Sequence, residues 1–113
     1  MHEMSIAESI LDIVEDEARK ADSAQVTRIV LEIGQLSCVE TEALSFCMDA
    51  VCRGTVAEGA DVQIISIPGL ARCGECQTEF EYTQRFTPCP GCGSYLVTVT
   101  GGEEMRIKEL EVA

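Results

Sequence analysis

Four cysteines in the second half of the chain form a C-x2-C-x12-C-x2-C array, which constrains the fold more than any other feature. They are Cys73, Cys76, Cys89 and Cys92. Each C-x-x-C pair can bend through a tight turn and present two thiolates to one ion, and Gly74 and Pro90-Gly91 favour such turns. Four thiolates complete a tetrahedral zinc site with no open position, so the metal is structural. The spacing predicts a zinc-binding lobe, with two disulfides as the alternative.

Length and charge exclude several classes of protein. The 113 residues suit one domain, or two small lobes, and 46% of them are hydrophobic. A formal net charge of −12 disfavours binding to nucleic acid or to an anionic membrane, and it favours metal cations or basic protein partners. We expect neither a secretory signal nor a membrane span. Seven cysteines without such a signal indicate a reducing, cytoplasmic location.

Two stretches have the periodicity of amphipathic helices. Ser5 and Glu8 fit a capping box, which predicts a helix over about 6–20 and leaves Met1 to Met4 outside it. A second helix should run from about residue 40 or 41 to Cys52. Its inward residues should be Ala43, Leu44, Cys47 and Val51.

The remaining segments have the composition of strands. The strands expected outside the cysteine segment are 26–33, 62–67 and 105–112, the last with a bulge near 108–109 to bring its apolar residues into phase. Short strands are expected near 80–82 and 95–100. The final strand has nothing to pack on by itself, so it should return to the first sheet.

These elements predict an α+β protein with a small mixed β-sheet and two helices. We expect a discontinuous metal-binding α/β lobe made of residues 1–69 and completed by the C-terminal strand 103–113. A zinc-ribbon-like lobe, residues 70–102, should be inserted into it.

His2 is the single histidine in the chain. A lone histidine is usually a surface residue, but a histidine at position 2 normally blocks removal of the initiator methionine. The Met1 amine, the His2 amide nitrogen and the His2 imidazole can then close adjacent chelate rings on one ion. Planar nitrogen sets of this kind select Ni(II) or Cu(II) over Zn(II).

The opening Met1-His2-Glu3-Met4-Ser5 resembles that of the HypA/HybF family, the nickel metallochaperones of [NiFe]-hydrogenase maturation. The resemblance covers essentially the whole chain. It also rests on the four zinc cysteines and on three internal segments. These are Ser37-Cys38-Val39-Glu40-Thr41, Phe46-Cys47 with Val51-Cys52-Arg53-Gly54, and Val56-Ala57-Glu58-Gly59.

The resemblance implies a nickel-binding lobe that contains the N-terminus, with Met1, His2 and Glu3 as nickel ligands or their backbone donors. It also implies delivery of nickel to the hydrogenase large subunit with a HypB-type GTPase, and in some organisms supply of urease. Some members use a further imidazole, which this chain lacks. The fourth donor must be the Glu3 backbone, a carboxylate such as Glu3 or Glu40, or water. We expect a monomer or weak homodimer.

Two other classes of function compete with a nickel metallochaperone. A zinc-ribbon protein- or nucleic-acid-binding module without nickel would share the four cysteines, although the predicted ribbon lacks a basic aromatic face. A thiol–disulfide oxidoreductase would need one activated C-x-x-C pair at a helix start. No P-loop and no nucleophile–histidine pair is present, so we expect no enzyme activity.

Three cysteines lie outside the zinc array. Cys47 and Cys52 are expected in the core, and Cys38 has no predicted role.

Overall fold

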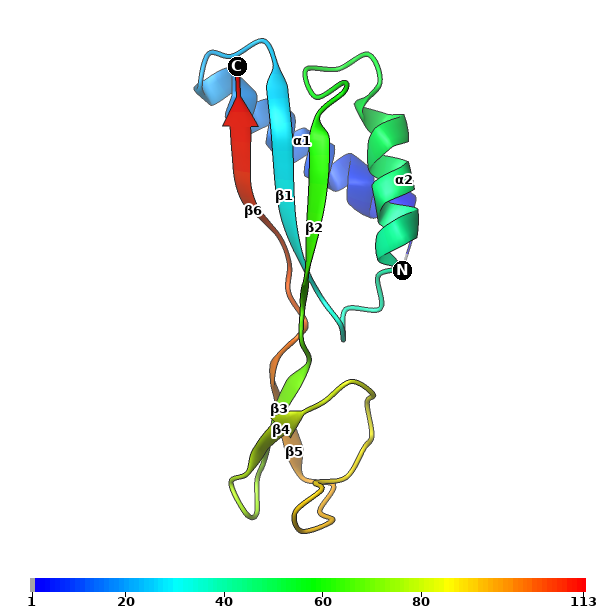
Figure 1. Cartoon of the computed structure of the whole chain (residues 1–113), viewed down its shortest axis with the longest axis vertical. Coiled ribbons are helices and arrows are strands. Elements are labelled where there is room, and N and C mark those ends of the chain that lie inside the picture. The colour runs from blue at the N-terminus through cyan, green and yellow to red at the C-terminus, as the bar shows by residue number, and fades with distance from the viewer. Residues whose placement is uncertain (1) are drawn as a thin grey trace. The chain divides into compact units, whose positions relative to one another are not determined.

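A computed structural model of the chain describes residues 2–113, which divide into two compact units. The first unit runs to Glu32 and includes Val39–Ile65 and Arg106–Ala113. The second unit comprises Ile33–Cys38 and Ser66–Met105. Two helices and two three-stranded sheets account for the regular structure of these residues (Figure 1). The predicted α+β class is confirmed.

Helix α1 spans Glu3–Lys20, and its buried residues recur at helical spacing. They are Ile6, Ala7, Ile10, Val14 and Ala18. The predicted capping box is wrong. His2 is the N-cap, with its carbonyl accepting the amide of Ile6 at 3.2 Å, and no side chain caps this end. The helix therefore begins two residues before Ser5, and Glu3 and Met4 lie inside it.

Helix α2 spans Thr41–Cys52, as predicted, and packs against α1. Its fully buried stripe is Leu44, Met48 and Cys52, at the four-residue spacing of one helix face. The other predicted inward residues, Ala43, Cys47 and Val51, flank this stripe and are half-buried. The prediction identified the correct face but missed Met48 at its centre.

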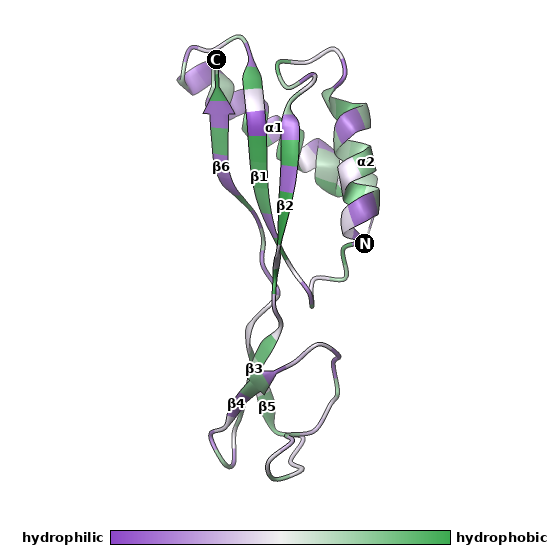
Figure 2. Ribbon diagram, viewed as in Figure 1, coloured by the Kyte–Doolittle hydropathy of each residue, from purple (hydrophilic) through white to green (hydrophobic). Residues whose placement is uncertain are grey.

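The sheet next to these helices has the strand order β2-β1-β6. Its strands are β1 (Val26–Gly34), β2 (Asp61–Ile67) and β6 (Met105–Val112). Hydrophobic residues dominate the central strand β1 (Figure 2), and Ile29, Val30 and Leu31 in succession are buried. Burial of consecutive residues means that both faces of β1 are covered, as the sequence indicated. β6 returns to this sheet, as predicted.

Strand β6 changes phase along its length. Ile107 and Leu110 are both half-buried although three residues separate them, which strict alternation does not produce. Glu109 and Glu111 both reach the guanidinium of Arg28, at 3.9 and 3.1 Å, so these two side chains share the opposite face. The change of phase is confirmed, and the bulge that would define it stays a prediction.

The second unit contains a small sheet of order β4-β3-β5. Its strands are β3 (Leu70–Cys73), β4 (Glu79–Glu81) and β5 (Val97–Gly101), and β3 pairs antiparallel with both neighbours. β4 and β5 begin within two residues of their predicted positions, whereas β3 was missed. Leu36, Ala71 and Tyr82 form the buried core, with Phe80, Val97 and Val99 packed against it.

Close backbone contacts fix the base of the second unit. The amide of Leu36 donates to the carbonyl of Gly102 at 2.7 Å, and the amide of Gly34 donates to the carbonyl of Glu104, also at 2.7 Å. A Cβ on Gly34 would collide with the carbonyl of Gly102. Gly102 has a φ of 97°, in the region that favours glycine. The approach of these two segments therefore requires glycine at both positions.

Candidate metal centres

The four array cysteines converge within the second unit. Their Sγ atoms all lie within 4.8 Å of one another, with Cys73 and Cys92 3.5 Å apart and Cys76 and Cys89 3.6 Å apart. A tetrahedron with zinc–sulfur bonds of about 2.3 Å has sulfur–sulfur edges of about 3.8 Å. The spacing of the thiols thus fits a zinc site.

Each C-x-x-C turn directs backbone amides at its first sulfur. Cys73 Sγ accepts the amides of Glu75 and Cys76 at 3.4 and 3.5 Å, and Cys89 Sγ accepts the amide of Gly91 at 3.3 Å. Amide donors stabilise a thiolate more than a neutral thiol. The turns predicted from Gly74 and Pro90-Gly91 therefore both position the sulfurs and favour their ionised form.

Thr78 is a contributor that the sequence did not reveal. Its hydroxyl lies 3.1 Å from Cys76 Sγ and can donate to the thiolate. This hydrogen bond, together with the backbone amide of Thr78, lowers the pKa of Cys76 to about 6. Amide hydrogen bonds from Cys76 and Glu75 likewise hold the pKa of Cys73 below its ordinary value. Two of the four thiols are thus predisposed to ionise.

Cys92 shows the opposite behaviour. The backbone of Ser94 favours its thiolate, but the neighbouring sulfurs of Cys73, Cys76 and Cys89 outweigh this and raise the pKa of Cys92 to about 12. Four thiolates at this separation repel one another, so the last proton leaves only when a cation replaces it. The donor set and its electrostatics therefore suit a divalent, thiophilic ion, and the cluster fits structural zinc.

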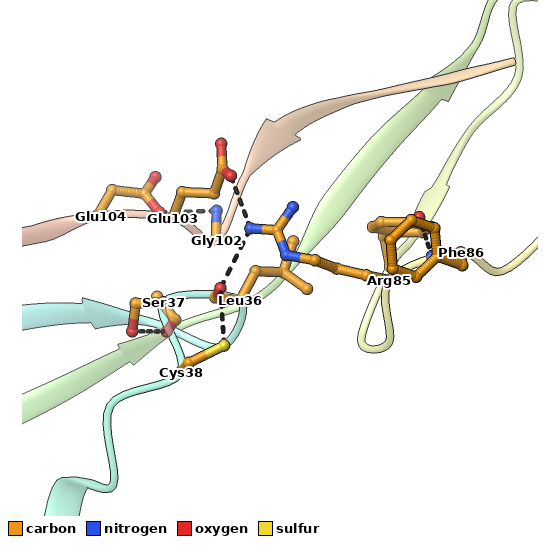
Figure 3. A network of polar contacts seen from close by, with 10 residues as sticks. Leu36, Ser37, Cys38, Arg85, Phe86, Gly102, Glu103 and Glu104 are labelled. Atoms are coloured by element: carbon orange, nitrogen blue, oxygen red, sulfur yellow. Dashed lines mark hydrogen bonds and ion pairs between the residues drawn. The ribbon is translucent and has the colours of Figure 1, made fainter. Parts of the chain in front are cut away.

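Arg85 fastens the long loop before Cys89 to the base of the second unit. Its guanidinium donates to the carboxylate of Glu103 at 2.7 Å and to the carbonyl of Leu36 at 3.3 Å (Figure 3). The same loop is held by Tyr82, whose hydroxyl accepts the amide of Phe86 at 2.7 Å. The two contacts of Arg85 join residues 49 and 18 positions apart, so no local pattern indicated them.

The predicted nickel ligands lie at the start of the first unit. Met1 lies outside the described residues. His2 is exposed and has an extended backbone (φ −85°, ψ 111°). Within residues 2–113 its imidazole makes no capping hydrogen bond. As the N-cap, His2 carries an amide that has no acceptor within the helix.

Glu3 joins the beginnings of the two helices. Its carboxylate accepts the backbone amide of Glu40 at 3.3 Å, and Glu40 is the N-cap of α2. The Glu40 side chain makes no capping bond of its own. Glu3 therefore supplies the acceptor for an amide at the start of α2, and its carboxylate contacts the backbone of Glu40, the other carboxylate residue considered as a nickel donor.

The other three cysteines lie apart from the cluster. Cys52 is buried, and this burial raises the pKa of its thiol, while Cys47 is half-buried on the same helix. Both therefore pack in or beside the core, as expected. Cys38 is exposed, with a φ of 63°, and its thiol donates a long hydrogen bond of 3.8 Å to the carbonyl of Leu36.

The geometry defines a small two-part protein with one preformed four-thiol site and a histidine free at its amino-terminal end. In residues 2–113, neither helix is long and apolar enough to cross a membrane. Residues 1–112 match the family described as "Hydrogenase/urease nickel incorporation, metallochaperone, hypA". The chain belongs to this HypA family.

Curated relatives match over nearly their full length. "Hydrogenase maturation factor HypA 2" of Bradyrhizobium diazoefficiens is 54% identical over 112 residues, which is 99% of each chain. "Hydrogenase maturation factor HypA" of Albidiferax ferrireducens gives the same identity and coverage. The solution structure of the Ni metallochaperone HypA from Helicobacter pylori superimposes with a TM-score of 0.71 at 26% identity, covering 99% of this chain and 97% of that one.

Proposed function

We propose that this protein carries nickel at its free amino terminus and delivers it for the maturation of a [NiFe]-hydrogenase. The Met1 amine, the His2 amide nitrogen and the His2 imidazole form the ligand set, with Glu3 close by. The zinc held by Cys73, Cys76, Cys89 and Cys92 is structural and takes no part in the transfer. Nickel is the cargo.

The position of His2 carries the proposal. An amide nitrogen can bind nickel only after it loses its proton, and inside a helix this would break a backbone hydrogen bond. The amide of an N-cap residue donates no such bond, so nickel can replace the proton of His2 without disturbing α1. The exposed imidazole is available to the same ion.

Glu3 has two functions in this proposal. Its backbone follows directly on the chelate, and its carboxylate holds the amide of Glu40 at 3.3 Å. The carboxylates of Glu3 and Glu40 supply negative charge that offsets the positive end of the α1 dipole, where a cation is otherwise disfavoured. Either carboxylate can complete the coordination, as can the Glu3 backbone or water.

In this proposal the two lobes have different roles. Residues 1–69, with the C-terminal strand 103–113, form the nickel-carrying lobe, and residues 70–102 form the zinc lobe. Nickel on an exposed terminus can be transferred donor by donor, as ligands of the acceptor replace it. The acceptor is the hydrogenase large subunit, and a HypB-type GTPase supplies the nucleotide hydrolysis for which this chain has no P-loop.

Metal analysis of the untagged protein tests the proposal. We expect one tightly held zinc before nickel is added and one further nickel afterwards. His2→Ala should remove the nickel and leave the zinc and the thermal unfolding midpoint unchanged, since His2 is outside the core. Retention of one tight nickel in His2→Ala would mean that the cysteines or the carboxylates form the actual site.

A further inference from the structure

An apolar groove runs along the first unit between α1 and the edge strand β6. It has a volume of about 470 Å³, and its apolar lining includes Ile13, Ile107, Leu110 and Val112. Ile13 is 53% exposed and Val112 is 41% exposed, which is unusual for aliphatic residues that lie close together. The carboxylate residue Glu17 of α1 also lines the groove. None of these residues belongs to the proposed metal sites.

The groove adjoins a strand edge without a partner among residues 2–113, because β6 is the last strand in the order β2-β1-β6. The amide of Ala113 donates to the carbonyl of Gln25, and the hydroxyl of Thr27 donates to the carbonyl of Glu111. Ala113 and Glu111 therefore direct their backbone groups toward β1. Successive residues of a strand alternate, so Leu110 and Val112 direct theirs to the free edge.

Free backbone groups beside exposed aliphatic side chains suit the addition of one more strand. Residues of an added strand opposite Leu110 and Val112 would share their face and enter the groove. The intervening residues would lie on the other face, where Glu109 and Glu111 share the guanidinium of Arg28, so that two carboxylates face one cation and the face keeps a net negative charge. An alternation of apolar and basic residues fits both faces.

We propose that β6 and this groove bind an extended segment of a partner protein in which aliphatic and basic side chains alternate. The net charge of −12 argues against a second copy of this chain as the occupant, since two such acidic surfaces would repel. The chemistry of the groove selects a basic partner, and the interface is a site of recognition separate from the metal carried at the amino terminus.

A short peptide tests this assignment with the zinc-loaded full-length protein. The probe is an acetylated and amidated peptide of about six residues, the usual strand length, in which valine and lysine alternate. A peptide of the same composition, with its valines and lysines in two blocks, is the control. We expect the alternating peptide to bind at least about tenfold more tightly, and to slow amide exchange at Leu110 and Val112 but not at Glu111.

Two variants with the same change of charge locate the site. Ile13→Lys places a cation in the groove at an exposed position and should weaken binding at least about tenfold. Phe46→Lys changes an exposed residue of α2, 73% accessible, and should leave binding unaltered. Equal binding of the two peptides would reduce the effect to general charge attraction and overturn the proposal. Protection of Leu110 and Val112 by self-association without peptide would overturn it too.

Discussion

The guanidinium of Arg85 lies 2.7 Å from the carboxylate of Glu103, and it joins two segments of the second unit that are 18 residues apart. The same guanidinium donates to the carbonyl of Leu36. The carboxylate of Glu103 raises the pKa of Arg85, so the pair favours the charged form of the arginine, and the loop that leads to Cys89 is held by an ionic contact.

Replacing this arginine should loosen the loop without unfolding the protein. The side chains of Arg85 and Glu103 are 43% and 54% exposed, so solvent screens the pair and its contribution to the free energy of unfolding is small. Arg85→Leu should accelerate amide exchange over 83–88 and scarcely move the unfolding midpoint. Arg72→Leu, an exposed change on β3, is the control. Unchanged exchange in both variants would show that Tyr82 alone holds the loop.

Thr78 should set the pH at which zinc is lost. Its hydrogen bond favours the Cys76 thiolate and lowers the pKa of Cys76 to about 6, so protons displace the metal only at low pH. Without the hydroxyl, the thiolate is less stable and protons compete better. Thr78→Ala should therefore release zinc at a higher pH than the wild type, as a chromophoric chelator would report.

Thr83→Ala, which changes an exposed threonine of the neighbouring loop, is the matched control and should leave the pH of release unchanged. If Thr78→Ala released zinc at the same or a lower pH, the hydroxyl would not be supporting the thiolate.

Removal of zinc should unfold the second unit locally. Because the metal replaces the protons of four adjacent thiols, its binding free energy is part of the folding free energy of this segment. Cys73→Ser should lose zinc and the amide protection of 70–102. The first unit has its own aliphatic core of residues such as Val14, Ile29 and Leu44, so it should keep its helices. Hydrogen exchange read by mass spectrometry separates the two units, and retained protection across 70–102 would contradict the prediction.

Gly34 should tolerate no side chain. A Cβ there would meet the carbonyl of Gly102, which is backbone and cannot rotate away. Gly34→Ala should lower the free energy of unfolding by about 1–3 kcal/mol, the usual cost of overpacking. At Gly101 the nearest atom to an added Cβ is 3.8 Å away, so Gly101→Ala is the control and should be near neutral in a denaturant titration.

Local patterns in the sequence predicted those parts of the fold that local interactions determine. The bounds of α2 followed from its periodicity, and β1 from its run of β-branched residues. The zinc cluster followed from spacing alone, since two C-x-x-C turns and one ion leave few other arrangements. The start of α1 was not predicted correctly from the capping-box pattern. The His2 carbonyl accepts the Ile6 amide, so Ser5 lies within the helix.

The remaining features depend on contacts between distant residues. Strand β3 is four residues long and follows a Pro-Gly pair, so its pairing with both neighbours gives no local signal. The contact of Glu3 with Glu40 joins residues 37 apart. Segment Ile33–Cys38 belongs to the second unit through hydrogen bonds to 67–104, which periodicity does not reveal.

The amino terminus itself provides the sharpest test of nickel binding. A residue placed before Met1 converts the free amine into an amide, which has no basic lone pair and changes the chelate rings. Loss of even an outer-shell partner commonly weakens metal binding about 10–100-fold, and this change removes a direct donor. An N-terminally extended protein should bind nickel at least that much more weakly.

A C-terminal extension of equal length is the control, and it should have little effect on nickel affinity. Both proteins should contain one zinc and unfold at the same midpoint, because neither change touches the core or the cysteine cluster. Nickel binding to the wild type should also weaken as the pH falls, since the metal replaces protons on nitrogen. Side-by-side nickel titrations decide the matter, because equal affinities of the two extended proteins would exclude the amine as a ligand.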